Sequence, residues 1–200
     1  MGKFGKWLSE PERLWSRAEI LLPATRCPVP REGGVYGWFF RSIPEPVPTD
    51  GCLQHRNLTL LYLGISPQAP PANGRPPSRQ TLLHRIRYHM RGNAYGSTLR
   101  LTLGCLLQEK LGIELRRVGS GSRMTFTIPG EEKLSAWLDE NAFVCWYVHP
   151  RPWEPEEELI RSIPLPLNLQ GNKSHPFHPV LSAIRNKAKE KARSLPVVAR

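Results

Sequence analysis

Two continuous apolar runs constrain the fold of this chain more than any other feature. They are Val35–Phe40 and Leu58–Ile65, and each includes aromatic and aliphatic side chains with little interruption by polar residues. A strand that is apolar on both faces is usually buried on both faces. We therefore expect the two runs to be central strands of one sheet. A tyrosine accompanies a glycine in each, in Gly34-Val35-Tyr36 and in Tyr62-Leu63-Gly64.

The rest of the chain predicts helices interleaved with short strands and proline-rich loops. Apolar spacing predicts helices over 11–22, 79–91, 98–111, 131–141, 155–163 and 179–194, and Ser78 is expected to cap the second of them. Further strands are expected over 115–118, 124–128 and 143–148, and loops over 42–51 and 67–78. The pattern favours a small α/β domain of the α+β kind, with helices packed on a sheet.

The charge balance favours a polyanionic partner. The chain has 28 lysines and arginines against 17 acidic residues, a formal net charge of +11. Nucleic acid and an anionic membrane surface are both candidates, and a merely soluble basic surface is the alternative. Arginines dominate the middle of the chain, and their forked donors suit phosphate oxygens. They are Arg75, Arg79, Arg85, Arg87, Arg91, Arg100, Arg116, Arg117 and Arg123.

Several classes of protein are disfavoured by what the sequence lacks. The four cysteines, Cys27, Cys52, Cys105 and Cys145, form no Cys-x-x-Cys pair, so a zinc site is not predicted. Scattered thiols are typical of a cytoplasmic protein. The N-terminal residues show no secretory signal pattern, and no apolar stretch approaches the roughly 18 residues that span a bilayer. We expect a cytoplasmic protein that does not enter the membrane.

The helix expected over 79–91 presents two polar side chains beside its apolar arc. Arg85 and His89 lie one turn apart at the edge of that arc, whereas Arg87 and Arg91 lie past the opposite edge. Arg85 and His89 could therefore reach into a cleft at the edge of the sheet. The alternative is a pair of boundary residues whose stems cover apolar surface.

Glu156 is the most unusual acidic residue of the chain. On the helix expected over 155–163, it lies in the middle of the apolar stripe formed by Leu159, Ile160 and Ile163. A carboxylate on an inward face is costly unless it is paired, hydrogen-bonded or bound to a metal. A structural salt bridge, perhaps to Arg85, and a single-carboxylate metal site both satisfy this requirement.

Taken together, these motifs resemble the GIY-YIG nuclease superfamily. Gly34-Val35-Tyr36 stands where that family has Gly-Ile-Tyr, and Tyr62-Leu63-Gly64 stands where it has Tyr-Ile-Gly. Arg85 and His89 match its helix with an arginine and a histidine four residues later. Glu156 matches its glutamate, and Asn168 matches the leucine-asparagine ending. The resemblance covers roughly residues 33–168 and departs from the family in both proline-rich loops and in the long stretch 93–142.

The resemblance implies a small, largely antiparallel three-stranded sheet flanked by helices, and metal-dependent hydrolysis of a DNA phosphodiester bond. Glu156 would hold one Mg²⁺ or Mn²⁺, cations that prefer carboxylate and water ligands. Arg85 would bind the scissile phosphate, and Tyr36 or Tyr62 would orient the attacking water and accept its proton. His89 would assist a tyrosine or contact phosphate, and Asn168 would position a backbone or phosphate group.

We expect three segments: an N-terminal extension over 1–30 with a short helix, a nuclease domain over 31–170 with an insertion at 93–142, and a basic helical extension over 171–200. The predicted nucleic-acid contacts are Arg85, Arg87, Arg91, Arg185, Lys187 and Lys189. Cutting both strands would call for a homodimer or two successive nicks. A non-catalytic nucleic-acid-binding module on the same fold is the main alternative. A membrane-surface protein ranks last, because the basic C-terminal helix lacks a face rich in Trp, Phe and Leu.

Overall fold

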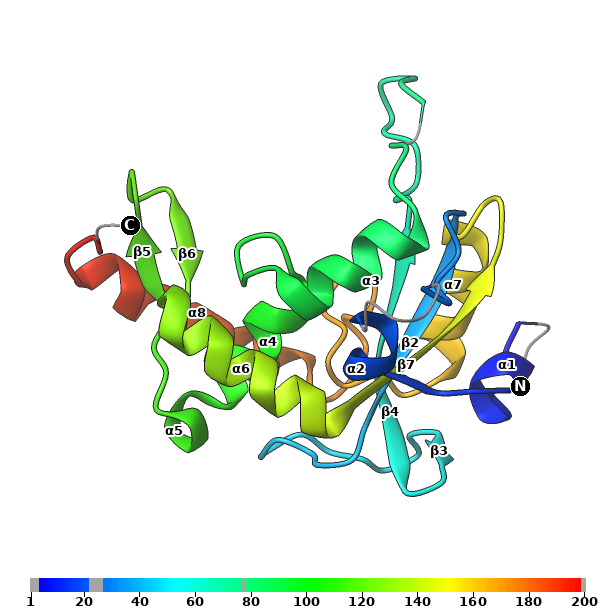
Figure 1. Ribbon diagram of the computed structural model, residues 1–200, viewed down its shortest axis with the longest axis horizontal. Helices are drawn as coiled ribbons and strands as arrows, with labels where there is room; N and C mark the ends of the chain where they lie inside the picture. Colours follow the sequence, from blue (N-terminus) through cyan, green and yellow to red (C-terminus); the bar gives the residue numbers. More distant parts are fainter. Residues whose placement is uncertain (1–3, 22–26, 77, 199–200) are drawn as a thin grey trace.

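A computed structural model describes residues 4–21, 27–76 and 78–198 (Figure 1). Its main sheet has five antiparallel strands in the order β1 (Trp15–Ser16), β7 (Ala142–Val148), β2 (Gly34–Phe40), β4 (Leu58–Ser66) and β3 (Gln54–His55). The expected three-stranded sheet is therefore a five-stranded one. The three long strands are those that the apolar runs predicted. The two added strands have two residues each, too few to show any hydrophobic period.

The two tyrosine-containing strands lie side by side at the centre of the sheet, as expected. Every residue of β2 and of β4 is buried. Tyr36 pairs with Gly64 on one side and with Trp146 on the other. A Cβ atom on Gly64 would lie 2.4 Å from the Tyr36 hydroxyl oxygen, so only glycine allows the phenol to cross β4 at this point. The glycine of the second triplet thus makes room for the tyrosine of the first.

Different helices cover the two faces of the sheet. The helix α3 (Leu82–Arg91) packs against β2 and β4 on the face that carries Tyr36 and Tyr62. On the opposite face lie α7 (Trp153–Ser162), which packs against the same two strands, and α1 (Lys6–Ser9), which packs against β7. The sheet is thereby buried on both sides, which explains why its central strands are apolar throughout.

Residues 98–141 and the last helix build the half of the molecule that lies away from the sheet (Figure 1). This half contains α4 (Thr98–Leu106), α5 (Gln108–Leu111), the hairpin of β5 (Arg116–Val118) and β6 (Arg123–Thr125), α6 (Thr127–Asn141) and α8 (His178–Ser194). The helix α8 packs against α4 and β5. The stretch expected to be an insertion is therefore in direct contact with the C-terminal helix.

The charged core of this half is an ion pair that the sequence did not reveal. Arg100 is fully buried, and its guanidinium donates to the Glu131 carboxylate at 2.8 and 2.9 Å and to the carbonyl oxygens of His89 and Met90. It joins α4, α6 and the end of α3. Arg100 is thus not available to phosphate, contrary to the expectation for the central arginines.

Several element boundaries differ from those expected. The helix α3 begins at Leu82, and Thr81 rather than Ser78 caps it, because the Thr81 hydroxyl accepts from the His84 amide. The expected helix over 11–22 shrinks to α2 (Arg17–Leu21), since Trp15 pairs with β7 and stacks on Trp146; residue 22 lies outside the described residues. The expected strand over 124–128 ends at Thr125, and the expected helix over 98–111 divides at Leu107. Within the described ranges, no helix is long and apolar enough to cross a membrane.

Candidate active site

Five of the six predicted site residues line one cleft of about 640 Å³. Tyr36 and Tyr62 come from adjacent strands, Arg85 from α3, Glu156 from α7, and Asn168 from the segment after α7. Arg185 of α8 also lines the cleft. The cleft thus opens where β4 meets helices from both faces of the sheet. The sixth residue, His89, lies behind Tyr36.

A buried chain of three side chains fixes the position of Tyr36. Its hydroxyl oxygen lies 2.8 Å from Nε2 of His89, and Nδ1 of the same ring lies 2.7 Å from the Ser97 hydroxyl oxygen. His89 has no exposed surface. Burial lowers the pKa of His89 well below its usual range, and the nearby Arg85 and Arg100 lower it further. The imidazole is therefore neutral, and it offers no exposed surface for the expected contact with phosphate.

The N-terminus of α4, where Ser97 lies, also holds Tyr62. Its hydroxyl oxygen lies 3.2 Å from Oγ1 of Thr98, the residue next to Ser97. Ser97 is also the N-cap of α4, since its hydroxyl accepts from the Arg100 amide at 3.1 Å. The start of α4 therefore positions both tyrosines. Sequence reasoning missed Ser97 and Thr98, although a serine before a leucine-rich helix is a recognisable cap signal.

Both phenols are protonated in this environment. Burial raises the pKa of Tyr36 well above 10.0, and the neighbouring Tyr62 raises it further, whereas Arg85 opposes the shift. Burial likewise raises the pKa of Tyr62. A tyrosinate base is consequently not the resting form of either residue.

Arg85 is the cationic group beside the tyrosines. Its Nη1 donates to the Gly96 carbonyl oxygen at 2.9 Å, and its side chain is half-buried. Burial lowers the pKa of Arg85, but the surrounding phenols of Tyr36, Tyr62 and Tyr88 raise it more, so the net shift is upward. One edge of a permanently charged guanidinium is anchored to the backbone, and the group borders the cleft.

Glu156 has no partner for its carboxylate. Within the described residues it forms no hydrogen bond or ion pair, so the expected salt bridge with Arg85 is absent. Burial raises the pKa of Glu156 to about 7. No group of three acidic, histidine or cysteine side chains with metal-binding geometry occurs in the part of the chain described. A lone, half-buried carboxylate on a polar cleft fits a hard divalent cation that keeps most of its water ligands.

Asn168 contacts the backbone of β4. Its Oδ1 accepts from the Leu63 amide at 2.9 Å, and its Nδ2 donates to the Leu63 carbonyl oxygen at 2.8 Å. The adjacent Leu167 amide donates to the Leu61 carbonyl oxygen. These bonds give partners to backbone groups of β4 at the edge that the short β3 leaves uncovered. They also hold the strand that carries Tyr62. Of the two roles expected for Asn168, the geometry shows the backbone contact.

The family comparison decides which kind of protein carries this cleft. A family model described as the GIY-YIG catalytic domain matches residues 34–187, more than half of the chain. The chain belongs to the GIY-YIG catalytic domain family. Comparisons with curated proteins and with solved structures gave no match. Membership in this family supports a nuclease-type enzyme that acts on nucleic acid.

The basic residues predicted to contact nucleic acid lie in different parts of the structure. Arg85 and Arg185 line the cleft, and Arg185 Nη1 lies 3.4 Å from the Thr102 hydroxyl oxygen. Arg87 and Arg91 are exposed on α3. Lys187 and Lys189 lie on different flanks of α8. Arg117, one of the central arginines, instead donates to the carbonyl oxygens of Ala192 and Leu195 and so holds the C-terminal segment.

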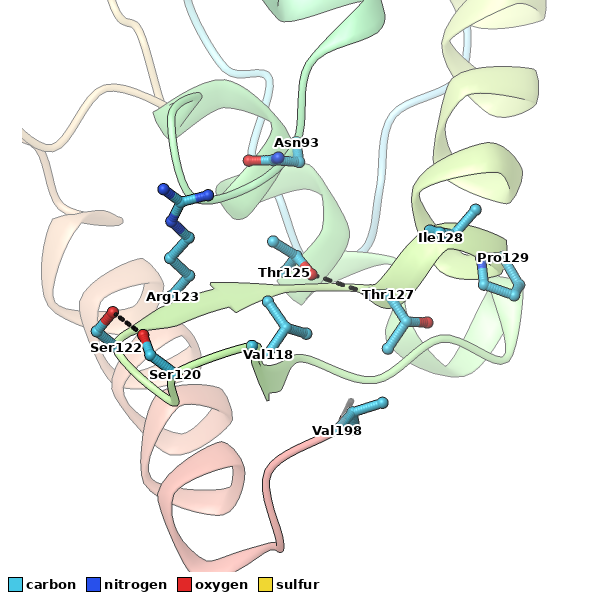
Figure 2. Close-up of a pocket in the computed structure, with 11 residues that line it drawn as sticks. Asn93, Val118, Ser120, Ser122, Arg123, Thr125, Thr127, Ile128, Pro129 and Val198 are labelled. Atoms are coloured by element: carbon cyan, nitrogen blue, oxygen red, sulfur yellow. Dashed lines mark hydrogen bonds between the residues drawn. The ribbon is translucent and has the colours of Figure 1, made fainter. Parts of the chain in front are cut away.

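A second hollow of about 810 Å³ lies beside the β5–β6 hairpin (Figure 2). Val118, Ile128, Pro129 and Val198 supply much of its wall, and Arg123 is the one charged residue that lines it within ranges 4–21, 27–76 and 78–198. No acidic, histidine or cysteine side chain of the described part of the chain lines it. Among the described residues, the carboxylate and the tyrosines predicted to take part in hydrolysis therefore line the tyrosine cleft and not this hollow.

Proposed function

We propose that this protein is a divalent-metal-dependent endonuclease that hydrolyses DNA phosphodiester bonds in the tyrosine cleft. The observation that carries the proposal is the convergence of Tyr36, Tyr62, Arg85 and the unpaired Glu156 on one cleft. Phosphodiester hydrolysis needs an oriented water, neutralised phosphate charge and a stabilised leaving oxygen. Each of these needs has a matching group among the four residues.

Glu156 would hold one Mg²⁺ or Mn²⁺. Its carboxylate lines the cleft, no described residue forms an ion pair with it, and burial raises its pKa. A bound divalent cation would compensate this cost and would supply electrostatic stabilisation of the phosphate and leaving oxygen. Asn168 supports the site through the backbone of β4, because both polar atoms of its side chain bond to Leu63.

Arg85 would bind the scissile phosphate. A guanidinium offers several donors in a planar fork, and the bond from Arg85 to Gly96 uses only one of them. That bond fixes the direction of the side chain, so little conformational entropy is lost when phosphate binds. Arg185 lines the same cleft and can neutralise a neighbouring phosphate.

Tyr36 would orient the attacking water. When His89 carries its proton on Nδ1 and donates it to Ser97, Nε2 accepts the phenolic proton of Tyr36. The phenol oxygen, which also interacts with the Arg85 guanidinium, would then accept a hydrogen bond from water in the cleft through a remaining lone pair. Because burial raises the pKa of both tyrosines, the phenol acts as a positioned neutral acceptor rather than as a preformed tyrosinate.

Cleavage of supercoiled plasmid with Mg²⁺ or Mn²⁺ tests the proposal. We expect the unmodified protein to nick, and Glu156→Gln to lose at least about 100-fold in rate. Glu157→Gln is the matched control, because Glu157 lies on the same helix, is exposed and pairs only with Arg161. Equal nicking by Glu156→Gln and the unmodified protein would refute the mechanism. Duplex binding without metal-dependent cleavage would instead favour a non-catalytic nucleic-acid-binding module.

A further inference from the structure

The helix α8 carries two rows of basic side chains on opposite flanks. Arg185, Lys189 and Arg193 follow one another at intervals of four residues, so they form one row along the helix. Lys187 and Lys191 form the second row, about 160° around the helix from the first at 100° per residue. A single helix therefore presents similar charge in two different directions.

The two rows have different electrostatic surroundings. Lys191 forms an ion pair with Glu114 at 2.7 Å, and the hollow that Lys187 and Lys191 line also contains Glu45 and Glu109. Lys189 and Arg193 form no ion pair or hydrogen bond among the described residues. Glu190, the only acidic residue of α8, is exposed and also unpaired. The second row faces carboxylates, whereas the first row lacks an acidic partner.

The positive charges of the first row repel one another. Burial lowers the pKa of Lys189, and the positive charges of Arg185 and Arg193 lower it further, although the Cys105 thiol opposes them. Three cations held together without a carboxylate repel one another in the free protein. A polyanion placed along the row would relieve that repulsion.

The first row also begins inside the candidate active site. Arg185 lines the tyrosine cleft together with Glu156 and Arg85. From Arg185 to Arg193 the helix advances about 12 Å at 1.5 Å per residue. This length matches about three nucleotides of one strand of B-form DNA, at 3.4 Å each. The row is thus a continuous cationic path from the cleft to the far end of α8.

We propose that the phosphodiester backbone of duplex DNA leaving the cleft lies along Arg185, Lys189 and Arg193, and that the Lys187–Lys191 flank does not contact it. The proposal rests on the proposed function, because it assumes that the cleft receives a DNA strand. It specifies the track of the substrate beyond the bond that is cut.

Two charge-matched double variants test this track. Lys189→Gln with Arg193→Gln removes two charges from the row, and Lys187→Gln with Lys191→Gln removes two from the opposite flank. Binding of a fluorescein-labelled duplex is measured by anisotropy in EDTA over a series of KCl concentrations. We expect the first variant to bind at least about tenfold more weakly and to reduce the slope of log K against log salt by about 1.8, at about 0.9 per lost phosphate contact.

The opposite-flank variant should keep the slope of the unmodified protein. Equal losses in the two variants would show that net charge alone matters and would overturn the track, as would an unchanged slope in the first variant. A loss confined to binding of phosphatidylserine vesicles would also overturn it, in favour of a membrane surface. Binding in EDTA requires no cleavage, so the track can hold even if plasmid nicking fails, and nicking can occur even if the track is wrong.

Discussion

The Tyr36 hydroxyl oxygen and Nε2 of His89 lie 2.8 Å apart in the interior of the protein. His89 has no exposed surface and is neutral, so it can act on a substrate only through Tyr36. Ser97, on the far side of the ring, fixes its orientation. In the proposed mechanism, His89 would therefore position Tyr36 and not bind phosphate.

Tyr36→Phe should lower the cleavage rate by about 100-fold or more, because the hydroxyl that orients water is lost. His89→Gln should lower it less, and the double variant should cleave no more slowly than Tyr36→Phe alone. A double-mutant cycle of single-turnover rates measures this coupling. Additive losses would contradict an action of His89 through Tyr36.

Thr98→Val should reduce cleavage by about fivefold, since one hydrogen bond to Tyr62 contributes about 1 kcal/mol. The substitution nearly preserves side-chain volume, so helix packing should be unchanged. In a Tyr62→Phe background the same substitution should have no effect. An undiminished loss in that background would mean that Thr98 acts by another route.

Glu156→Gln should stabilise the metal-free protein while abolishing cleavage. Burial gives this carboxyl a pKa of about 7 in the folded state, against an ordinary value of 4.5. The folded state therefore holds the proton more tightly, and ionisation of Glu156 lowers the free energy of unfolding as pH rises from about 4.5 to about 7. In EDTA at about pH 8, the variant should gain about 1–3 kcal/mol.

Thermal unfolding over a pH series measures this gain. Below about pH 4.5 the gain should vanish, because Glu156 is then protonated in both states. Glu157→Gln, on the exposed side of α7, should show no comparable gain at any pH. A Glu156→Gln variant that is less stable at alkaline pH would indicate that the carboxylate has a cationic partner.

Arg85 and Arg100 should respond in opposite ways to replacement by glutamine. Arg85→Gln should keep its stability and lose cleavage, because its guanidinium borders the cleft. Arg100→Gln removes the cationic partner of the half-buried Glu131, and should cost about 3–5 kcal/mol of stability. Urea unfolding and plasmid nicking separate the two effects. If Arg100→Gln folded normally but failed to bind DNA, the structural assignment of Arg100 would be wrong.

Asn168→Ala should destabilise the fold by about 3 kcal/mol, because two backbone groups of Leu63 lose their partner. The exposed Asn186 of α8 offers a matched control, and Asn186→Ala should be nearly neutral. Denaturant midpoints report both values. A neutral Asn168→Ala with lost cleavage would assign Asn168 to the substrate instead.

The central strands and the inward carboxylate could be predicted because each is a local pattern. Burial on both faces makes β2 and β4 apolar throughout, and helical periodicity places Glu156 on the inner side of α7. The same periodicity placed His89 at the edge of the apolar arc, where it is in fact fully buried. Angular position gives the face of a helix, but depth depends on what packs over that face.

The contacts made by residues 93–142 could not be predicted in this way. Ser97, Thr98 and Arg100 lie on one turn of α4, yet they serve Tyr36, Tyr62 and Glu131 through partners that are distant in sequence. Nothing in the sequence distinguishes Arg100 from the other arginines in the middle of the chain. No local signal distinguishes a cation that pairs with a buried carboxylate from one that faces solvent.

The sequence by itself determined that two apolar, tyrosine-bearing strands lie centrally in a sheet, that Glu156 faces inward, and that the chain carries the GIY-YIG motifs. These properties follow from hydrophobic period and residue order, which are local. Only the tertiary structure decided that the start of α4 holds both tyrosines, that no described cation pairs with Glu156, and that Arg185 of α8 lines the cleft. Those relationships depend on packing between elements that are distant in the chain. Hydrogen bonds and burial at such contacts produce no periodic pattern of residues in the sequence.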